Sequence, residues 1–134
     1  MVEKKKWTIE EKAMEYVRRY LRDVEHVQHI EEPKHGADII ADGKAIDVKG
    51  CEKWETNVRM MQQALDKVAE QGKLKQGSFY IYYVCNMSTE KPQLMKIDYN
   101  TFKANKQVEL RWIIQPKQLK EKPEPIPLKK IEFT

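Results

Sequence analysis

The sequence predicts a single α/β domain in which helices flank a central mixed sheet, and three segments carry this prediction. Residues 8–24 begin with a capping box, Thr8 and Glu11, and continue with apolar residues at helical spacing. Residues 36–50 form two alternating runs separated by Asp42-Gly43, the dipeptide signal of a tight β-hairpin. Residues 78–85 are aromatic or β-branched on both faces, which indicates a central strand covered on both sides.

Length and composition are those of a globular domain. The chain has 134 residues, of which 40% are hydrophobic and 34% charged. It contains no apolar run long enough to cross a bilayer and no signal-peptide pattern, so we expect a cytoplasmic protein without a membrane partner. The net charge of +4 lies at the two ends of the chain. Contacts with nucleic acid are therefore expected from local groups and from these ends.

The Asp42-Gly43 turn fixes the register of the predicted hairpin. Asp38 then lies opposite Asp47, and Lys49 shares their face of the sheet. The other face carries the predicted core residues Ile39, Ala41, Ile46 and Val48. Two facing carboxylates repel each other, whereas a divalent cation between them would make the arrangement favourable. The alternative interpretation is a solvated hairpin whose charged face meets water.

The sequence from Asp38 through the hairpin to Asp47-Val48-Lys49 resembles the core motif of the PD-(D/E)XK nucleases, the restriction-endonuclease-like superfamily. Asp38 matches the first acid of that motif, and Ala37 stands where the family has its proline. The predicted order of helix, strand, hairpin, helix and strand is similar to the αβββαβ core of that fold. The resemblance covers residues 8–85. It implies a Mg²⁺-dependent DNA endonuclease in which Mn²⁺ can substitute, without a small-molecule cofactor, and small members of the superfamily are often homodimers.

The resemblance also implies roles for individual residues. The implied metal ligands are Asp38, Asp47, the Val48 carbonyl and Glu10. Lys49 would position or deprotonate the attacking water, or offset charge on the transition state. Glu10 begins a pattern, Glu-x-x-Ala-x-x-Tyr-Val, that looks like the first helix of the family, with Glu11 and Glu15 as alternatives. An acid in a first helical turn can equally serve to complement the helix dipole.

Three further residues are candidates for nucleic-acid contact, namely Lys34, His35 and Lys53. The first two precede Asp38 and could reach a phosphate, or be ordinary loop residues. Gln62 is a weaker candidate, because some nucleases of this superfamily use a helix glutamine near the site. The competing hypothesis is a catalytically inactive nuclease-fold module that binds nucleic acid or a protein partner.

The remaining elements are predicted from periodicity and turn residues. We expect strands over residues 24–30, 94–97 and 108–114, a helix over 56–71 and a short helix capped by Asp98. Cys51 and Cys85 are expected to be buried apolar groups. The domain is assigned to residues 1–114, and the proline- and lysine-rich tail to 115–134. This tail is predicted to have little regular structure, or to wrap the domain or a partner through Leu128, Ile131 and Phe133.

Overall fold

A six-stranded mixed sheet forms the centre of the protein. The computed structural model describes residues 6–34, 36–53, 58–60, 79–98, 101, 107–108, 112–114 and 124–133. The sheet has the order β1 (Ile30–Glu31), β2 (Ile39–Ala41), β3 (Lys44–Gly50), β5 (Phe79–Cys85), β6 (Gln93–Asp98) and β9 (Ile126–Pro127). β3 and β5 pair in parallel, and the other neighbours pair antiparallel. The predicted α/β class with a central mixed sheet is confirmed.

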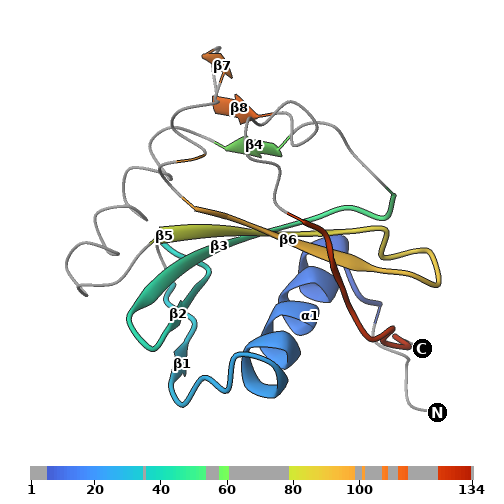
Figure 1. Ribbon diagram of the computed structural model, residues 1–134, viewed down its shortest axis with the longest axis horizontal. Helices are drawn as coiled ribbons and strands as arrows, with labels where there is room; N and C mark the ends of the chain where they lie inside the picture. The colour runs from blue at the N-terminus through green and yellow to red at the C-terminus, as the bar shows by residue number, and fades with distance from the viewer. Residues whose placement is uncertain are drawn as a thin grey trace.

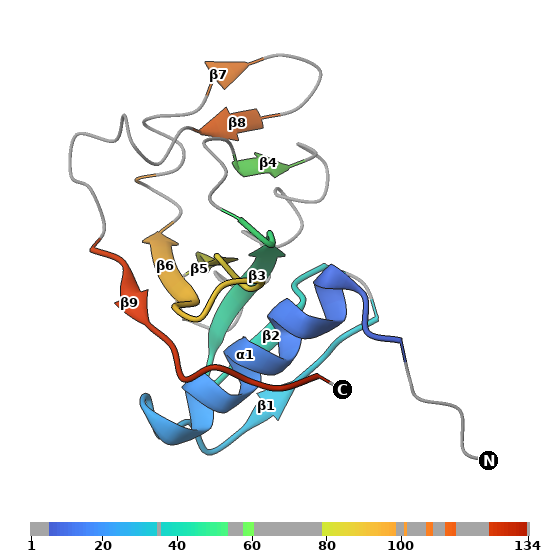
Figure 2. The same ribbon diagram turned by 90° about the vertical axis from the view of Figure 1, so that its right-hand side faces the viewer.

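The sheet is covered on one side by α1 (Ile9–Asp23) and faces a second, smaller sheet on the other. Figures 1 and 2 show α1 and the small sheet on opposite sides of the strands β3, β5 and β6. The small sheet has the order β4 (Val58–Met60), β8 (Trp112–Ile114) and β7 (Gln107–Val108). Within the described residues, no helix is both long enough and apolar enough to cross a membrane.

The helix α1 begins where its capping box predicts. The Thr8 hydroxyl accepts the Glu11 backbone N–H, and the Glu11 carboxylate accepts the Thr8 backbone N–H, which satisfies two otherwise unpaired donors. The predicted apolar stripe is buried in its middle, at Ala13, Tyr16, Val17, Tyr20 and Leu21. The two ends of the stripe, Ile9 and Val24, are exposed.

A close approach of backbone and helix fixes the position of α1 on the sheet. A Cβ atom added at Gly50 would lie 2.6 Å from the Cβ of Ala13 and 3.6 Å from Ile9. The first turns of the helix therefore lie directly on the end of β3. This contact brings the N-terminal end of α1 next to Asp47 and Lys49, which belong to the same strand.

The hairpin follows its predicted geometry. Asp42 and Gly43 have φ values of 44° and 88°, the left-handed conformation that a type I′ turn requires. Ile39 pairs with Ile46 and Ala41 with Lys44, as the turn predicts. The core residues Ile39, Ala41 and Ile46 pack against α1, with Val48 partly buried beside them. Next to β3 in the sheet, β5 is buried on both faces, as expected of a central strand.

The predicted strand over residues 24–30 is wrong, because β1 covers only Ile30–Glu31. This segment is hydrogen-bonded to the end of α1 instead, because the Val27 backbone N–H donates to the Leu21 carbonyl. His26, the residue before Val27, has a left-handed conformation with φ of 53°. The Asp42 carboxylate accepts the backbone N–H groups of Gln28 and His29, the two residues after Val27. Alternating sequence cannot reveal these two hydrogen-bonding partners.

Two further predictions fail where the structure describes them. The helix predicted over residues 56–71 is contradicted at Val58–Met60, which forms β4 because β8 pairs with it; residues 61–71 lie outside the described residues. The single strand predicted over 108–114 is instead the pair β7 and β8, in which Val108 lies opposite Trp112. A strand and a short hairpin share the same alternation, so periodicity did not separate them.

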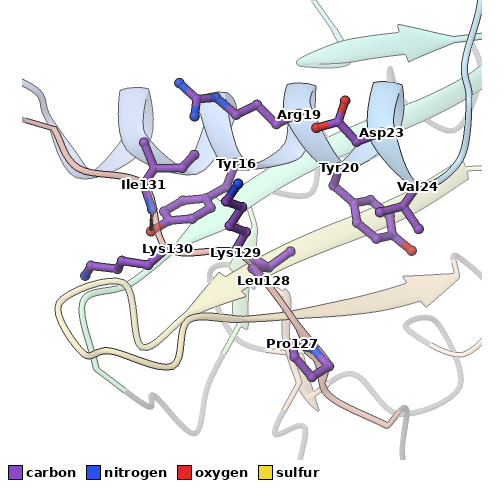
Figure 3. A pocket seen from close by; sticks show the side chains of 10 residues that line it. All are labelled: Tyr16, Arg19, Tyr20, Asp23, Val24, Pro127, Leu128, Lys129, Lys130 and Ile131. Atoms are coloured by element: carbon purple, nitrogen blue, oxygen red, sulfur yellow. Dashed lines mark hydrogen bonds between the residues drawn. The ribbon is translucent and has the colours of Figure 1, made fainter.

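The described part of the tail, residues 124–133, wraps the domain, which was one of the two predicted alternatives. It has little regular structure, as predicted, apart from the two-residue strand β9, which pairs with β6. Beyond it, the Ile131 backbone N–H donates to the Tyr16 hydroxyl at 3.1 Å, and the Phe133 ring packs against Trp7 and Tyr16. Figure 3 shows the side chains that line a hollow of about 300 Å³ between α1 and this segment. Cys51 and Cys85 are both buried, as predicted.

Candidate functional site

The residues predicted for the metal site come together around one pocket. It has a volume of about 390 Å³ and lies where α1, the loop after β1 and the strand β3 meet. Its lining residues are Glu10, Met14, Glu32, Pro33, Asp38, Asp47, Val48 and Lys49. Four of these side chains are acidic and one is a lysine. Asp38, Asp47, Lys49 and Glu10, each named from the sequence, thus share one cavity.

Asp38 lies at the point where β2 begins. The hairpin ladder extends only as far as Ile39, which pairs with Ile46, so within the described part of the chain no strand pairs with residues 47–50 of β3 on that side. The Asp38 backbone N–H donates to the Ile46 carbonyl, and its carboxylate accepts the Val48 backbone N–H at 2.8 Å. Asp38 and Asp47 are therefore not paired directly across the hairpin as predicted. Asp38 bonds instead to the backbone of Ile46 and Val48 on β3.

Asp47 is an acid in an unfavourable environment. It is 7% exposed, and its Oδ2 atom finds no hydrogen-bond partner among the described residues. The Lys49 ammonium lies 3.6 Å from this oxygen, close enough to attract it. Burial raises the pKa of Asp47 to about 7; the charge of Lys49 lowers it, whereas repulsion by Asp38 raises it. A buried oxygen without a hydrogen-bond partner is costly, and a cation bound beside it would offset that cost.

The acids of the first helical turns have different neighbours. Glu10 lines the pocket and is exposed. The Glu11 carboxylate is used by the capping box, and Glu15 pairs with Arg18 and Arg19 at 3.6 and 3.5 Å. Of the three candidates, Glu10 is the one whose position suits the pocket.

The sequence interpretation did not identify Met14, Glu32 or Pro33 as pocket residues. Glu32 accepts two hydrogen bonds from the Arg18 guanidinium, at 2.8 and 2.6 Å. These bonds with Arg18 hold the pKa of Glu32 below its usual range. In the sequence Glu32 is one of several charged residues in the segment before Asp38, and nothing distinguishes it from a solvated loop acid. One signal could have identified Glu32. Glu10, Met14 and Arg18 are spaced four residues apart and so share one side of α1, which places a basic partner for an acid on the side that carries Glu10.

The residues predicted to contact nucleic acid lie elsewhere or are not described. Lys34 and Lys53 are exposed, and neither lines the pocket. The backbone carbonyl of Lys53 accepts the Asn86 N–H. His35 and Gln62 lie outside the described residues. These roles therefore stay predictions.

The donor set fits a hydrated hard cation better than a fully caged one. Among the described residues, no three His, Cys, Asp or Glu side chains converge closely enough to hold a metal ion by themselves. Mg²⁺, however, keeps several waters and is commonly bound through one or two carboxylates. Asp38 and Asp47 supply two carboxylates, and the unpartnered Oδ2 of Asp47 is the atom that such an ion would satisfy.

Fold and pocket together define a mixed α/β domain with an acid-lined pocket between α1, the loop after β1 and the strand β3. The family model described as "Protein NO VEIN, C-terminal" matches residues 9–97, and the chain belongs to this family. The matched region contains nearly all of the main sheet and all the residues that line the pocket. None of the curated proteins with which the sequence was compared matches it.

Proposed function

We propose that this chain is a Mg²⁺-dependent DNA endonuclease of the PD-(D/E)XK type, with its site in the pocket of Asp38, Asp47 and Lys49. The observation that supports the proposal best is the buried, unpartnered oxygen of Asp47 beside a second aspartate. Burial raises the pKa of Asp47 to about 7 in spite of Lys49, so the ionised acid is costly there, and a divalent cation would offset that cost. The sequence motif and the shared pocket support the same function independently.

The side chains suit distinct roles in phosphodiester hydrolysis. Asp38 and Asp47 would hold the cation together with the carbonyl of Val48, a residue that also lines the pocket. A bound Mg²⁺ supplies a Lewis acid and lowers the pKa of a coordinated water. The Lys49 ammonium, 3.6 Å from Asp47, would position the attacking water or offset the charge that develops on the phosphate. Glu10, at an exposed position in the lining, would accept hydrogen bonds from waters of the cation.

The second candidate is a nuclease-fold module that binds nucleic acid or protein without cleaving it. The positive charge lies at the two ends of the chain and leaves the body between them near neutral, which limits affinity for DNA and favours this candidate. The two functions differ in what the pocket does once DNA is bound, and a cleavage experiment separates them.

The test is cleavage of plasmid, branched and flapped DNA with millimolar Mg²⁺ or Mn²⁺. The matched variants are Asp47→Asn in the pocket and Glu52→Gln, an exposed acid outside it. Metal-dependent cleavage by the wild type and by E52Q, lost in D47N, supports the endonuclease. DNA binding without cleavage under either metal supports the inactive module instead.

A further inference from the structure

Arg18 and Glu32 join two walls of the pocket. Arg18 follows Glu10 and Met14 on one side of α1, and Glu32 belongs to the loop that leaves β1. The Arg18 guanidinium donates two hydrogen bonds to the Glu32 carboxylate, from Nε to Oε2 at 2.8 Å and from Nη2 to Oε1 at 2.6 Å. Glu32 is therefore held at the pocket lining in one orientation.

Stability alone gives a weak reason for this pair. The two side chains are 25% and 40% exposed, and ion pairs of such exposure contribute little to folding. Its geometric effect is larger, because a two-bond fork fixes a carboxylate that would otherwise sample many rotamers. Each carboxylate oxygen can accept a second hydrogen bond, so pairing with Arg18 leaves Glu32 able to bind water.

The pocket also holds an independent sign of a missing ligand. Asp47, buried and lining the same cavity, carries an oxygen without a hydrogen-bond partner among the described residues. A cation at that oxygen would be hydrated, since three close protein ligands are not present in the described part of the chain. Its waters would extend toward the remaining acids of the lining.

We propose that Glu32, held in place by Arg18, belongs to the set of residues that bind the divalent cation, through hydrogen bonds from cation-bound waters. This inference rests on the proposed cation site and adds an outer-shell ligand to it. Outer-shell carboxylates orient the waters of a bound ion and raise its affinity. Arg18 is the positioning residue, because it fixes the carboxylate without lining the pocket itself.

Two effects of Arg18 can be told apart by their sign. Its positive charge close to the pocket disfavours a cation, so loss of that charge alone would strengthen cation binding. Loss of the fork releases Glu32 and would weaken binding. Weaker binding by Arg18→Ala, in spite of the more negative pocket, would therefore report on positioning.

The test is calorimetric titration of the intact chain with Mn²⁺. Glu32→Gln and Arg18→Ala should each weaken binding about tenfold, which is typical of outer-shell substitutions. The double variant should be no weaker than either single variant, because Glu32 acts only when Arg18 holds it. Glu31→Gln and Arg19→Ala are the matched controls, since each neighbours its counterpart but lies outside the pocket lining, and both should bind as the wild type does.

The outcomes separate this inference from the proposed function. Unchanged binding by E32Q, or tighter binding by R18A, overturns the role of Glu32 even if Asp47→Asn abolishes binding and so upholds the cation site. Absence of Mn²⁺ binding by the wild type overturns both. Melting temperatures of the metal-free variants distinguish a loss of the site from a loss of the fold. A tenfold loss in variants that melt like the wild type supports the inference.

Discussion

Replacement of Asp47 by Asn tests directly whether this acid is buried at a cost. The ordinary pKa of the group is 3.8, and burial raises it to about 7. At 1.36 kcal/mol per unit, ionisation of Asp47 in the metal-free folded protein costs on the order of 4 kcal/mol at a pH above 7. Asn removes this cost, but its buried amide also needs partners. We therefore expect D47N to stabilise the metal-free protein by roughly 1–3 kcal/mol at about pH 8.

The effect should depend on pH with a definite sign. Because the pKa of Asp47 in the folded protein lies above its unfolded value, the folded state binds the proton more tightly. The contribution of Asp47 to stability is therefore full below about pH 4 and is lost as pH rises through about 7. The advantage of D47N should shrink accordingly toward low pH. Acids held by ion pairs, such as Glu32 beside Arg18, act in the opposite direction, but they are the same in both proteins.

The assay is urea unfolding of wild type and D47N, in the presence of a chelator, at several pH values from about 5 to about 8. The difference in unfolding free energy between the two proteins isolates Asp47. A difference that stays constant with pH, or a D47N protein that is less stable at the highest pH, would refute the account of a carboxylate that is buried at a cost.

Three further predictions concern the packing of α1 and of the tail. Gly50→Ala should destabilise the protein by about 1–3 kcal/mol in urea unfolding, because the new Cβ would lie 2.6 Å from the Ala13 Cβ. The loss should be smaller when Gly50→Ala is made in an Ala13→Gly background, and an equal loss in both backgrounds would argue against this contact as the cause. Deletion of residues 117–134 should lower the melting temperature, since it exposes the apolar surface that Ile131 covers and leaves the Tyr16 hydroxyl without its donor, at a cost on the order of 3 kcal/mol. The same truncation should keep its Mn²⁺ affinity, because no residue of the described tail lines the pocket; loss of affinity in a folded truncation would contradict the assignment of the site.

Local chemistry made part of this fold predictable. The capping box of Thr8 and Glu11 marked the start of α1, and Asp42-Gly43 fixed the hairpin register in which Ile39 pairs with Ile46. Both signals act over a few residues, so they survive without knowledge of the tertiary structure. The central strand β5 was equally clear, because burial on both faces leaves a continuous apolar run.

The rest depended on contacts between distant segments. The Asp42 carboxylate determines the conformation of residues 28–29, and β8 converts Val58–Met60 into a strand. Glu32 reaches the pocket because Arg18, on another element, holds it there. A pattern along the chain contains no information on such partners. Asp38, Asp47 and Lys49 could therefore be predicted from the sequence, whereas Glu32 was not.

Thermal melting with and without millimolar Mg²⁺ or Mn²⁺ tests the central claim most directly, namely that Asp38 and Asp47 form a cation site. A ligand that binds the folded state raises its melting temperature by mass action. The account predicts a clear rise for the wild type and a much smaller one for Asp47→Asn. Equal shifts in the two proteins, or no shift in either, would contradict the cation site and the proposed catalysis with it.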